Sequence, residues 1–208
     1  MCYQIQLNTG VKEIAKRFKK VITNPDSIVF TDEINGFAFQ PMPIITIENP
    51  DVVSTDFNWG LIPHWSKDDA IRKNTLNAKI ETLSEKPSFR DVITNRCLVI
   101  ATGYYEWRWN DLKGKSKDKY EIHSAENEIF TFAGIYSKWR NPKTGLEINT
   151  FSLVTTQANE TMAYVHNMKK RMPIVLRQED ELKWLDLQTP YEEFSYPNYD
   201  AKLIAIKR

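Results

Sequence analysis

A series of short apolar segments separated by turn-forming residues constrains the fold of this chain more than any other feature of its sequence. These segments are rich in β-branched and aromatic residues, often alternate with polar ones, and cover residues 44–48, 96–101, 104–109, 119–123, 129–136 and 148–156. Such composition and alternation are typical of β-strands. Residues 110–118 and 140–147 combine Gly, Asn or Pro with charged side chains, as hairpin loops do. The sequence therefore predicts a mostly antiparallel sheet.

Short helices are predicted on both sides of these strands. Apolar residues recur at helical spacing within residues 11–18, with basic side chains on the opposite face. Residues 178–186 begin with acidic side chains, as helix first turns often do, and residues 75–82 are a further candidate helix. We expect an α+β fold: a single domain over residues 1–208, built on a curved, mostly antiparallel, barrel-like β-sheet with a few short flanking helices.

Composition narrows the class of protein. With 208 residues, 41% of them hydrophobic, the chain can bury one sizeable core. No signal peptide and no apolar run long enough to cross a bilayer is recognisable, and two cysteines do not make a disulfide framework, so we expect a cytoplasmic protein without membrane association. A net charge of +1 gives no global indication of nucleic-acid binding, so any basic surface must be local.

Cys2 is the first candidate functional residue. Only Met1 precedes it, so removal of Met1 would leave Cys2 with a free α-amine and a thiol on adjacent carbons. The amine can attack an aldehyde to form an imine, and the thiol can then add to the imine and close a five-membered thiazolidine ring. An α-amine has a pKa of about 7.7–8.0, against about 10.4 for lysine, so much of it is nucleophilic at neutral pH. The alternative is a small buried thiol in an N-terminal strand.

Three further polar residues are candidates, each with an ordinary structural alternative. Asn77 can hold an amine or a sugar oxygen without adding charge, or it can be a common polar residue at a helix start. Glu106 lies between aromatic residues, where poor solvation would suit proton transfer, or it faces solvent on its strand. His166 can exchange a proton near neutral pH, or it is a loop histidine before a solvated basic run.

Several sequence blocks occur in an order that resembles one known family. The blocks are "MC" at the N-terminus, "WGLIPHW", "LNAKIET", "RCLVIATGYYEW" and "HNMKKRMPIVL", and they extend from residue 2 to about residue 176. Together they resemble the SOS-response-associated peptidase (SRAP) family of abasic-site processing proteins. Each block alone is weakly specific, whereas the ordered set with its N-terminal Cys is specific.

The resemblance implies a mechanism in which the initiator Met is removed and Cys2 captures the ring-opened aldehyde of an abasic site in single-stranded DNA. The product would be a stable thiazolidine crosslink that shields the lesion during DNA repair. By resemblance, Asn77 would orient the α-amine and the sugar, and Glu106 would serve as acid and base in ring closure and in Met1 removal. His166 would help to open the deoxyribose. A lyase or crosslink-reversal activity would use the same Glu and His.

A single-stranded DNA partner calls for stacking surfaces and local positive charge. Trp65 and Trp107 are the candidates for stacking, although packing in the core or at its rim is an equally good account of each. The family motifs imply backbone contacts from Lys79 and Arg171. An abasic nucleotide has no base to stack, so its sugar is easily moved into a pocket. We expect binding that is largely independent of sequence and sensitive to salt.

The chain departs from the usual family pattern at three places. The familiar opening is Cys-Gly-Arg, whereas here Tyr3 and Gln4 follow the cysteine, so an arginine next to the nucleophile is missing. Lys79 stands where Arg is common, which removes bidentate phosphate geometry. Residues 167–170 separate His166 from "RMP", a longer gap than usual. These differences affect the expected phosphate contacts, including that of Arg171, more than the expected catalytic set.

Other classes of function stay open from the residues alone. An N-terminal-nucleophile hydrolase would use Cys2 to cleave an amide, with its own α-amine as base. A non-enzymatic module would bind undamaged and abasic single-stranded DNA equally well. A metal site built from the Cys and His residues is disfavoured because no C-x-x-C or H-x-x-x-H spacing occurs, and Cys97 is most simply a core residue. We expect no cofactor and a monomer that is associated with the nucleoid when bound to DNA.

Overall fold

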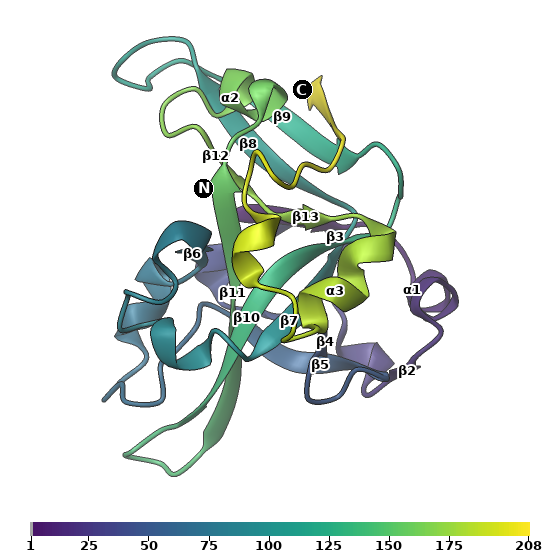
Figure 1. Cartoon of the computed structure of the whole chain (residues 1–208), viewed down its shortest axis with the longest axis vertical. Helices are drawn as coiled ribbons and strands as arrows, with labels where there is room; N and C mark the ends of the chain where they lie inside the picture. Colours follow the sequence, from purple (N-terminus) through teal and green to yellow (C-terminus); the bar gives the residue numbers. More distant parts are fainter. Residues whose placement is uncertain (1) are drawn as a thin grey trace.

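The computed structural model describes residues 2–208, and its centre is a closed barrel of five strands (Figure 1). The barrel strands are β4 (Pro41–Thr46), β5 (Val52–Trp59), β7 (Arg96–Ala101), β10 (Phe130–Arg140) and β11 (Glu147–Gln157). Neighbours around the barrel are antiparallel except β5 and β11, which pair in parallel and close it. Closure pairs each barrel strand with a barrel neighbour on both sides over part of its length, which removes free strand edges there.

A second sheet of five strands packs beside the barrel in the order β14-β9-β8-β1-β3. Its strands are β1 (Gln4–Leu7), β3 (Thr31–Asn35), β8 (Gly103–Trp109), β9 (Lys117–Ser124) and β14 (Leu203–Lys207). Short strands extend the barrel sheet: β2 (Val21–Ile22), β6 (Asn77–Lys79), β12 (Arg171–Pro173) and β13 (Val175–Leu176). The N-terminal strand β1 therefore lies inside a sheet, with partners on both sides.

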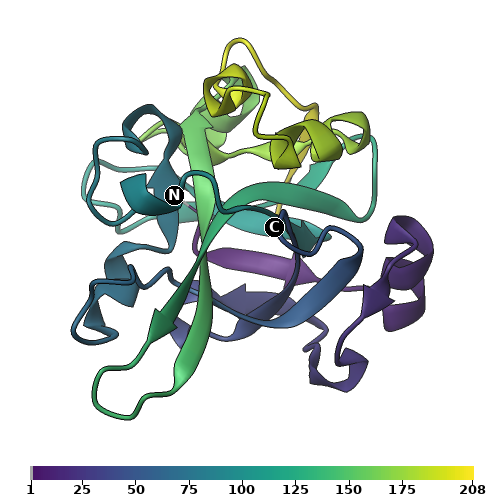
Figure 2. The same ribbon diagram turned by 60° about the horizontal axis from the view of Figure 1, so that its bottom comes forward.

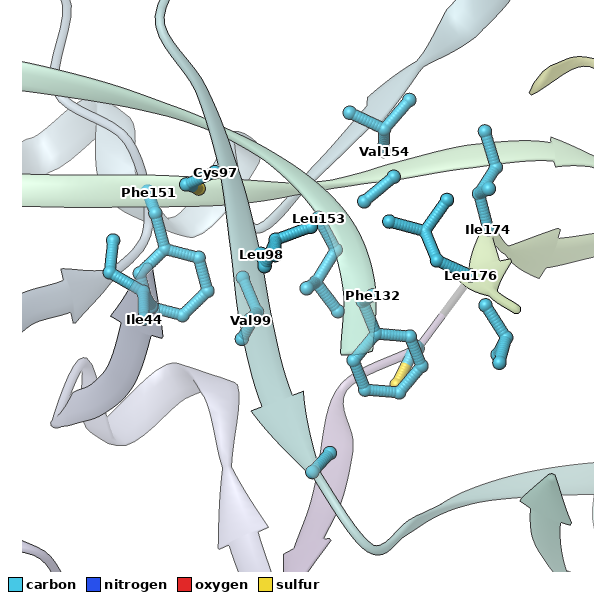
Figure 3. Close-up of a cluster of buried hydrophobic side chains, with 14 of the residues drawn as sticks. Ile44, Cys97, Leu98, Val99, Phe132, Phe151, Leu153, Val154, Ile174 and Leu176 are labelled. Atoms are coloured by element: carbon cyan, nitrogen blue, oxygen red, sulfur yellow. The ribbon is translucent and has the colours of Figure 1, made fainter. Parts of the chain in front are cut away.

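Figure 3 shows a cluster of buried hydrophobic side chains to which the barrel strands contribute. Side chains from these strands meet there, among them Ile44, Val99, Phe132 and Leu153, all fully buried. Alternate residues of a strand point to the same side, which explains how short segments with a period of two supply a shared interior. Every residue of β7 is buried, because α3 packs on its other side. A strand covered on both faces reads as a continuous apolar run, as "CLVIA" does.

Short helices cover the ends and the outside of the sheets. They are α1 (Val11–Phe18), α2 (Glu160–Val165) and α3 (Glu181–Leu185). Helix α1 buries Ile14 and Phe18, the face that its apolar spacing predicts. Helix α3 is fastened to the barrel by Trp184, whose indole N–H donates to the carbonyl of Cys97 at 3.0 Å. No helix among residues 2–208 is long and apolar enough to cross a membrane.

The predicted fold class is confirmed, and one local expectation is wrong. A barrel-like, mostly antiparallel sheet with short flanking helices is what the structure contains. Residues 75–82 do not form an α-helix: Asn77–Lys79 is strand β6, followed by a 3-10 turn at Ile80–Thr82. Strand β6 pairs in parallel with β11, and this long-range pairing outweighs the local helical pattern.

The hairpin between β10 and β11 extends beyond the barrel in both views (Figures 1 and 2). Towards its C-terminal end, β11 also pairs with β6 at Leu153–Thr155 and with β12 at Thr155–Gln157. Strand β8 of the second sheet and the start of β1 approach each other through the pairing of Gln4 with Tyr105. The candidate functional residues come from these strands and from the loop after α2.

Removing a side chain from the barrel interior is expected to destabilise the whole fold. Leu153→Ala should lower the free energy of unfolding by about 3 kcal/mol, because it leaves a cavity in a close-packed core. Leu112→Ala is the matched control: Leu112 is 89% exposed, and a change within about 0.5 kcal/mol is expected. Urea denaturation followed by circular dichroism measures both, and equal effects of the two changes would contradict the assignment of the core.

Candidate functional site

The structure brings Cys2, Asn77, Glu106 and His166 together from four separate parts of the chain. Cys2 precedes β1, Asn77 begins β6, Glu106 is on β8 and His166 follows α2. The side-chain amide of Asn77 donates to the carbonyl oxygen of Cys2 at 2.8 Å. Nε2 of His166 lies 4.0 Å from a carboxylate oxygen of Glu106. The pairing of Gln4 with Tyr105 then brings Cys2 and Tyr3 close enough for the charge of Glu106 to act on both.

Cys2 is buried and is held by contacts to Gln4 and Asn77. Its side chain is fully buried, its carbonyl accepts from Asn77, and its thiol donates to the carbonyl of Gln4 at 3.6 Å. Burial raises the pKa of the Cys2 thiol, and the negative charge of Glu106 raises it further. The thiol is therefore protonated at neutral pH. The expected removal of Met1 concerns a residue outside the described range.

Glu106 and His166 lie near each other, and both are buried. Glu106 is 4% exposed and His166 is 8% exposed. Burial lowers the pKa of His166, while the charge of Glu106 opposes that change. Nδ1 of His166 lies 2.8 Å from the carbonyl oxygen of Arg171, which can only accept, and 3.3 Å from the backbone N–H of Arg171, which can only donate; the shorter contact favours a proton on Nδ1 of the neutral ring. At 4.0 Å, Nε2 and the Glu106 carboxylate are too far apart for a direct hydrogen bond.

Arg171 is clamped inside the protein rather than extended into solvent. Its guanidinium makes two hydrogen bonds to the carboxylate of Glu81, at 2.6 and 2.9 Å, and a third to the carbonyl of Thr155 at 2.8 Å. Burial raises the pKa of Glu81, but the hydrogen bonds from Arg171, a backbone hydrogen bond and the charges of Arg171 and Lys79 together outweigh it, and the net shift is downward. Because the Arg171 backbone holds the His166 ring, this clamp also positions His166.

The other DNA-binding candidates differ in their exposure and in their contacts. Lys79 is exposed and lies two residues after Asn77 on β6, so both side chains are on the same face of the strand. Trp65 is half-exposed, and its indole N–H donates to the carbonyl of Pro87 at 3.2 Å. Trp107 follows Glu106 on β8 and therefore points to the opposite face, where the ammonium of Lys119 lies 6.0 Å from its ring.

Sequence reasoning missed some residues that surround the site. Tyr104 is fully buried on the same face of β8 as Glu106, and burial raises the pKa of its phenol. The alternation of "GYYEW" would have indicated this placement. The clamp residues Glu81 and Thr155 are far apart in sequence, and no local pattern connects them. No group of three or more His, Cys, Asp or Glu suited to a metal ion occurs among residues 2–208.

Comparisons with known proteins identify the family of the chain. The SOS response associated peptidase (SRAP) family model matches residues 1–203. The abasic site processing protein YoqW of Bacillus subtilis (strain 168) is 43% identical over 129 residues, which are 62% of this chain and 55% of YoqW. The abasic site processing protein HMCES of Gallus gallus is 32% identical over 163 residues, 67% of this chain and 47% of HMCES. The chain spans about half the length of these curated relatives.

A solved structure is similar over nearly the whole chain. The crystal structure of a protein from Bacteroides thetaiotaomicron matches with a TM-score of 0.86 and 36% identity, covering 99% of this chain and 92% of that chain. The barrel, the second sheet and the segments that carry the candidate site are thus shared with an experimentally determined fold.

Because Arg171 is held by this clamp, we expect its substitution to destabilise the fold more than substitution of Lys79. Arg171→Ala should lower the free energy of unfolding by about 2 kcal/mol, because it removes charged hydrogen bonds and leaves Glu81 without them. Lys79→Ala, at an exposed site, should change it by less than about 0.5 kcal/mol.

The stability difference between wild type and Arg171→Ala should depend on pH. The lowered pKa of Glu81 means that the stability it contributes is present above its unfolded pKa of about 4.3 and is lost as the pH falls through its folded pKa. The difference between wild type and Arg171→Ala in urea denaturation should therefore shrink towards pH 3. A difference that is the same at pH 7 and pH 3 would contradict the clamp.

Proposed function

The chain belongs to the SOS response associated peptidase family, and from that premise we propose that it captures abasic sites in single-stranded DNA by forming a thiazolidine with Cys2. Two relatives bear the name abasic site processing protein. The observation that carries the proposal is the convergence of a buried N-terminal cysteine with an amide, a carboxylate and an imidazole. The crosslink would shield the lesion during repair.

The first step is imine formation by the α-amine of Cys2, which becomes available when Met1 is removed. The amine attacks the aldehyde of the ring-opened sugar, and the resulting carbinolamine loses one water molecule to form a carbon–nitrogen double bond. Asn77 fixes the carbonyl group of Cys2, so the backbone that carries the amine has a defined position. Holding nucleophile and electrophile in a defined geometry is worth several orders of magnitude in rate.

The second step is addition of the thiol to the imine carbon. The sulfur–carbon bond forms, the thiol proton leaves the sulfur, and the ring nitrogen gains a proton. Because burial keeps the Cys2 thiol protonated, a nearby base must accept that proton as the bond forms. Glu106 is the carboxylate whose charge acts on the thiol, and we assign it this role. The same carboxylate would assist removal of Met1 and reversal of the crosslink.

His166 is assigned the proton transfers that open the sugar. An abasic deoxyribose is mostly a closed ring, and capture requires its aldehyde form, which is reached by moving a proton between the ring oxygen and the anomeric hydroxyl. Burial lowers the pKa of His166, so the ring is neutral at pH 7, with Nε2 as the basic nitrogen. The Glu106 carboxylate on the same side would stabilise the imidazolium that forms after Nε2 accepts a proton.

DNA contacts complete the proposal. Lys79 is exposed beside Asn77, a position suited to a phosphate next to the abasic sugar. Trp65 has exposed ring surface for stacking. Arg171 and Trp107 were expected to contact DNA as well; for Arg171 this requires the clamp to open, and for Trp107 it requires DNA on the outer face of β8. The structure thus favours Lys79 and Trp65.

Replacing the nucleophile is expected to abolish capture. Wild-type protein incubated with uracil-containing single-stranded DNA after uracil excision should give a denaturing-gel band that withstands heating, and Cys2→Ala should give none. Cys97→Ala is the control, because Cys97 lies in the barrel interior and should leave the band intact. A heat-stable band from Cys2→Ala would contradict the proposal. Amide cleavage without any adduct would instead favour an N-terminal-nucleophile hydrolase.

Glu106 and His166 are expected to affect the rate but not the fold. Glu106→Gln and His166→Ala should each slow capture by about 10²–10⁴-fold, the usual range for loss of a general acid–base. The wild-type rate should fall as the pH drops below about 7.7–8.0, because the α-amine becomes protonated. Since burial lowers the pKa of His166, no second fall should appear near pH 6.5. A second inflection there would contradict the buried, neutral imidazole.

A further inference from the structure

A small cleft opens directly beside the proposed nucleophile. Its volume is about 170 Å³, and it is lined by Tyr3, Lys73, Asn74, Leu76 and Asn77. Asn77 belongs both to this cleft and to the catalytic set, where it holds the carbonyl of Cys2. Tyr3 is the residue that follows the nucleophile. If a ligand is bound at Cys2, the part of it next to the reacting atoms would therefore lie at the opening of this cleft.

One wall of the cleft continues into an exposed aromatic pair. The rings of Tyr3 and Phe37 lie 5.1 Å apart, with an angle of 36° between their planes. Phe37 is 49% exposed, so this pair lies at the surface rather than in the core. An exposed pair of rings is the kind of surface on which an unpaired base stacks.

Backbone hydrogen bonds hold the pair in place. The N–H of Gly36 donates to the carbonyl of Tyr3 at 2.8 Å, and the N–H of Phe37 donates to the side chain of Asn35 at 3.0 Å. Gly36 fits because a Cβ there would come within 3.2 Å of Trp59 and Leu76. The pair is thus pre-organised, and stacking a base on it would require little ordering of the protein.

The lining of the cleft also supplies positive charge. Lys73 is exposed, and none of the ion pairs formed within residues 2–208 involves it. Gln4, at the position where the family opening has arginine, has its side-chain oxygen buried and turned away from solvent. Lys73, in the lining of the cleft, can thus supply a phosphate contact in place of the arginine that is missing at position 4.

We propose that Tyr3, Phe37 and Lys73 form the subsite for the nucleotide adjacent to the abasic sugar. Its base stacks on the Tyr3–Phe37 pair, and Lys73 contacts its phosphate. This inference rests on the proposed function and adds a preference that the capture chemistry does not supply. A purine offers more stacking surface than a pyrimidine, so single-stranded DNA with a purine next to the lesion binds more tightly.

The test measures non-covalent binding to single-stranded DNA that contains tetrahydrofuran, an abasic analogue without an aldehyde. Tyr3→Ala and Phe37→Ala should each weaken affinity about tenfold, the loss typical of one stacked base. Phe30→Ala is the control, because Phe30 is also a partly exposed aromatic residue and lies outside the cleft, and its affinity should be unchanged. Phe37→Trp should retain wild-type affinity.

A second DNA isolates the stacking contact. In this DNA both nucleotides next to the tetrahydrofuran also lack bases, so no base is available to stack. Wild type and the two Ala variants should then bind equally. Two further DNAs, each lacking one neighbouring base, identify the side on which stacking occurs. Lys73→Gln should reduce the slope of log affinity against log salt by about one on every DNA, because one phosphate contact is lost.

Each outcome decides between the subsite and the capture chemistry. Equal losses on the DNA with and without neighbouring bases, or no loss at all, would overturn the subsite while leaving Cys2 capture untouched. Because tetrahydrofuran has no aldehyde, tight base-dependent binding without any adduct on true abasic DNA would overturn the proposed function alone. Unchanged urea denaturation of Phe37→Ala, whose side chain is half-exposed, excludes misfolding as the cause of a loss.

Discussion

The position of strand β1 between β8 and β3 is the constraint on which the rest of the candidate site depends. Chain termini usually fray unless they are tied into a sheet. Here Gln4 is paired on both sides, with Tyr105 and with Asn35, so the residues just before it have a defined path. A reactive N-terminal residue needs this kind of anchoring, because its amine and thiol are useful only if both approach one carbon atom. The full burial of Cys2 follows from that anchoring.

The two sheets each supply half of the site. The second sheet contributes β1 and β8, and with them Cys2 and Glu106. The barrel contributes through β11, which pairs with β6 at Leu153–Thr155 and with β12 at Thr155–Gln157. One barrel strand thus positions the amide that holds Cys2 and the backbone that holds His166. Burial between the sheets then sets the protonation states: a protonated thiol and a neutral imidazole at pH 7.

Much of the sheet could be predicted from the sequence, because a strand leaves a local pattern. The segments 96–101 and 104–109 coincide with β7 and nearly with β8, and the predicted loops at 110–118 and 140–147 contain the turns between paired strands, at residues 110–116 and 141–146. The parallel closure of β5 on β11 leaves no such pattern. The same reason explains the wrong expectation of a helix at residues 75–82, where a distant strand decides the conformation. The family resemblance is confirmed by the match over residues 1–203.

For the site, the sequence could indicate which residue types matter but not how they are arranged. Cys2, Asn77, Glu106 and His166 are identifiable as candidates, and the structure brings them together. Arg171 and Glu81 are far apart in the sequence, so no local pattern predicts the hydrogen bond between them. Arg171 was expected to contact phosphate, but the structure places it in this internal clamp. Likewise, the aromatic pair of Tyr3 and Phe37 becomes visible only when β1 and β3 are placed side by side.

The intact mass of the protein–DNA adduct tests the central claim most directly. The account predicts a covalent species, formed without any reductant, whose mass equals that of the protein lacking Met1 plus the abasic DNA minus one water. Digestion should locate the linkage at Cys2. An active protein that still carries Met1, or an adduct that survives only after borohydride reduction and maps to a lysine, would contradict capture by the N-terminal amine and thiol.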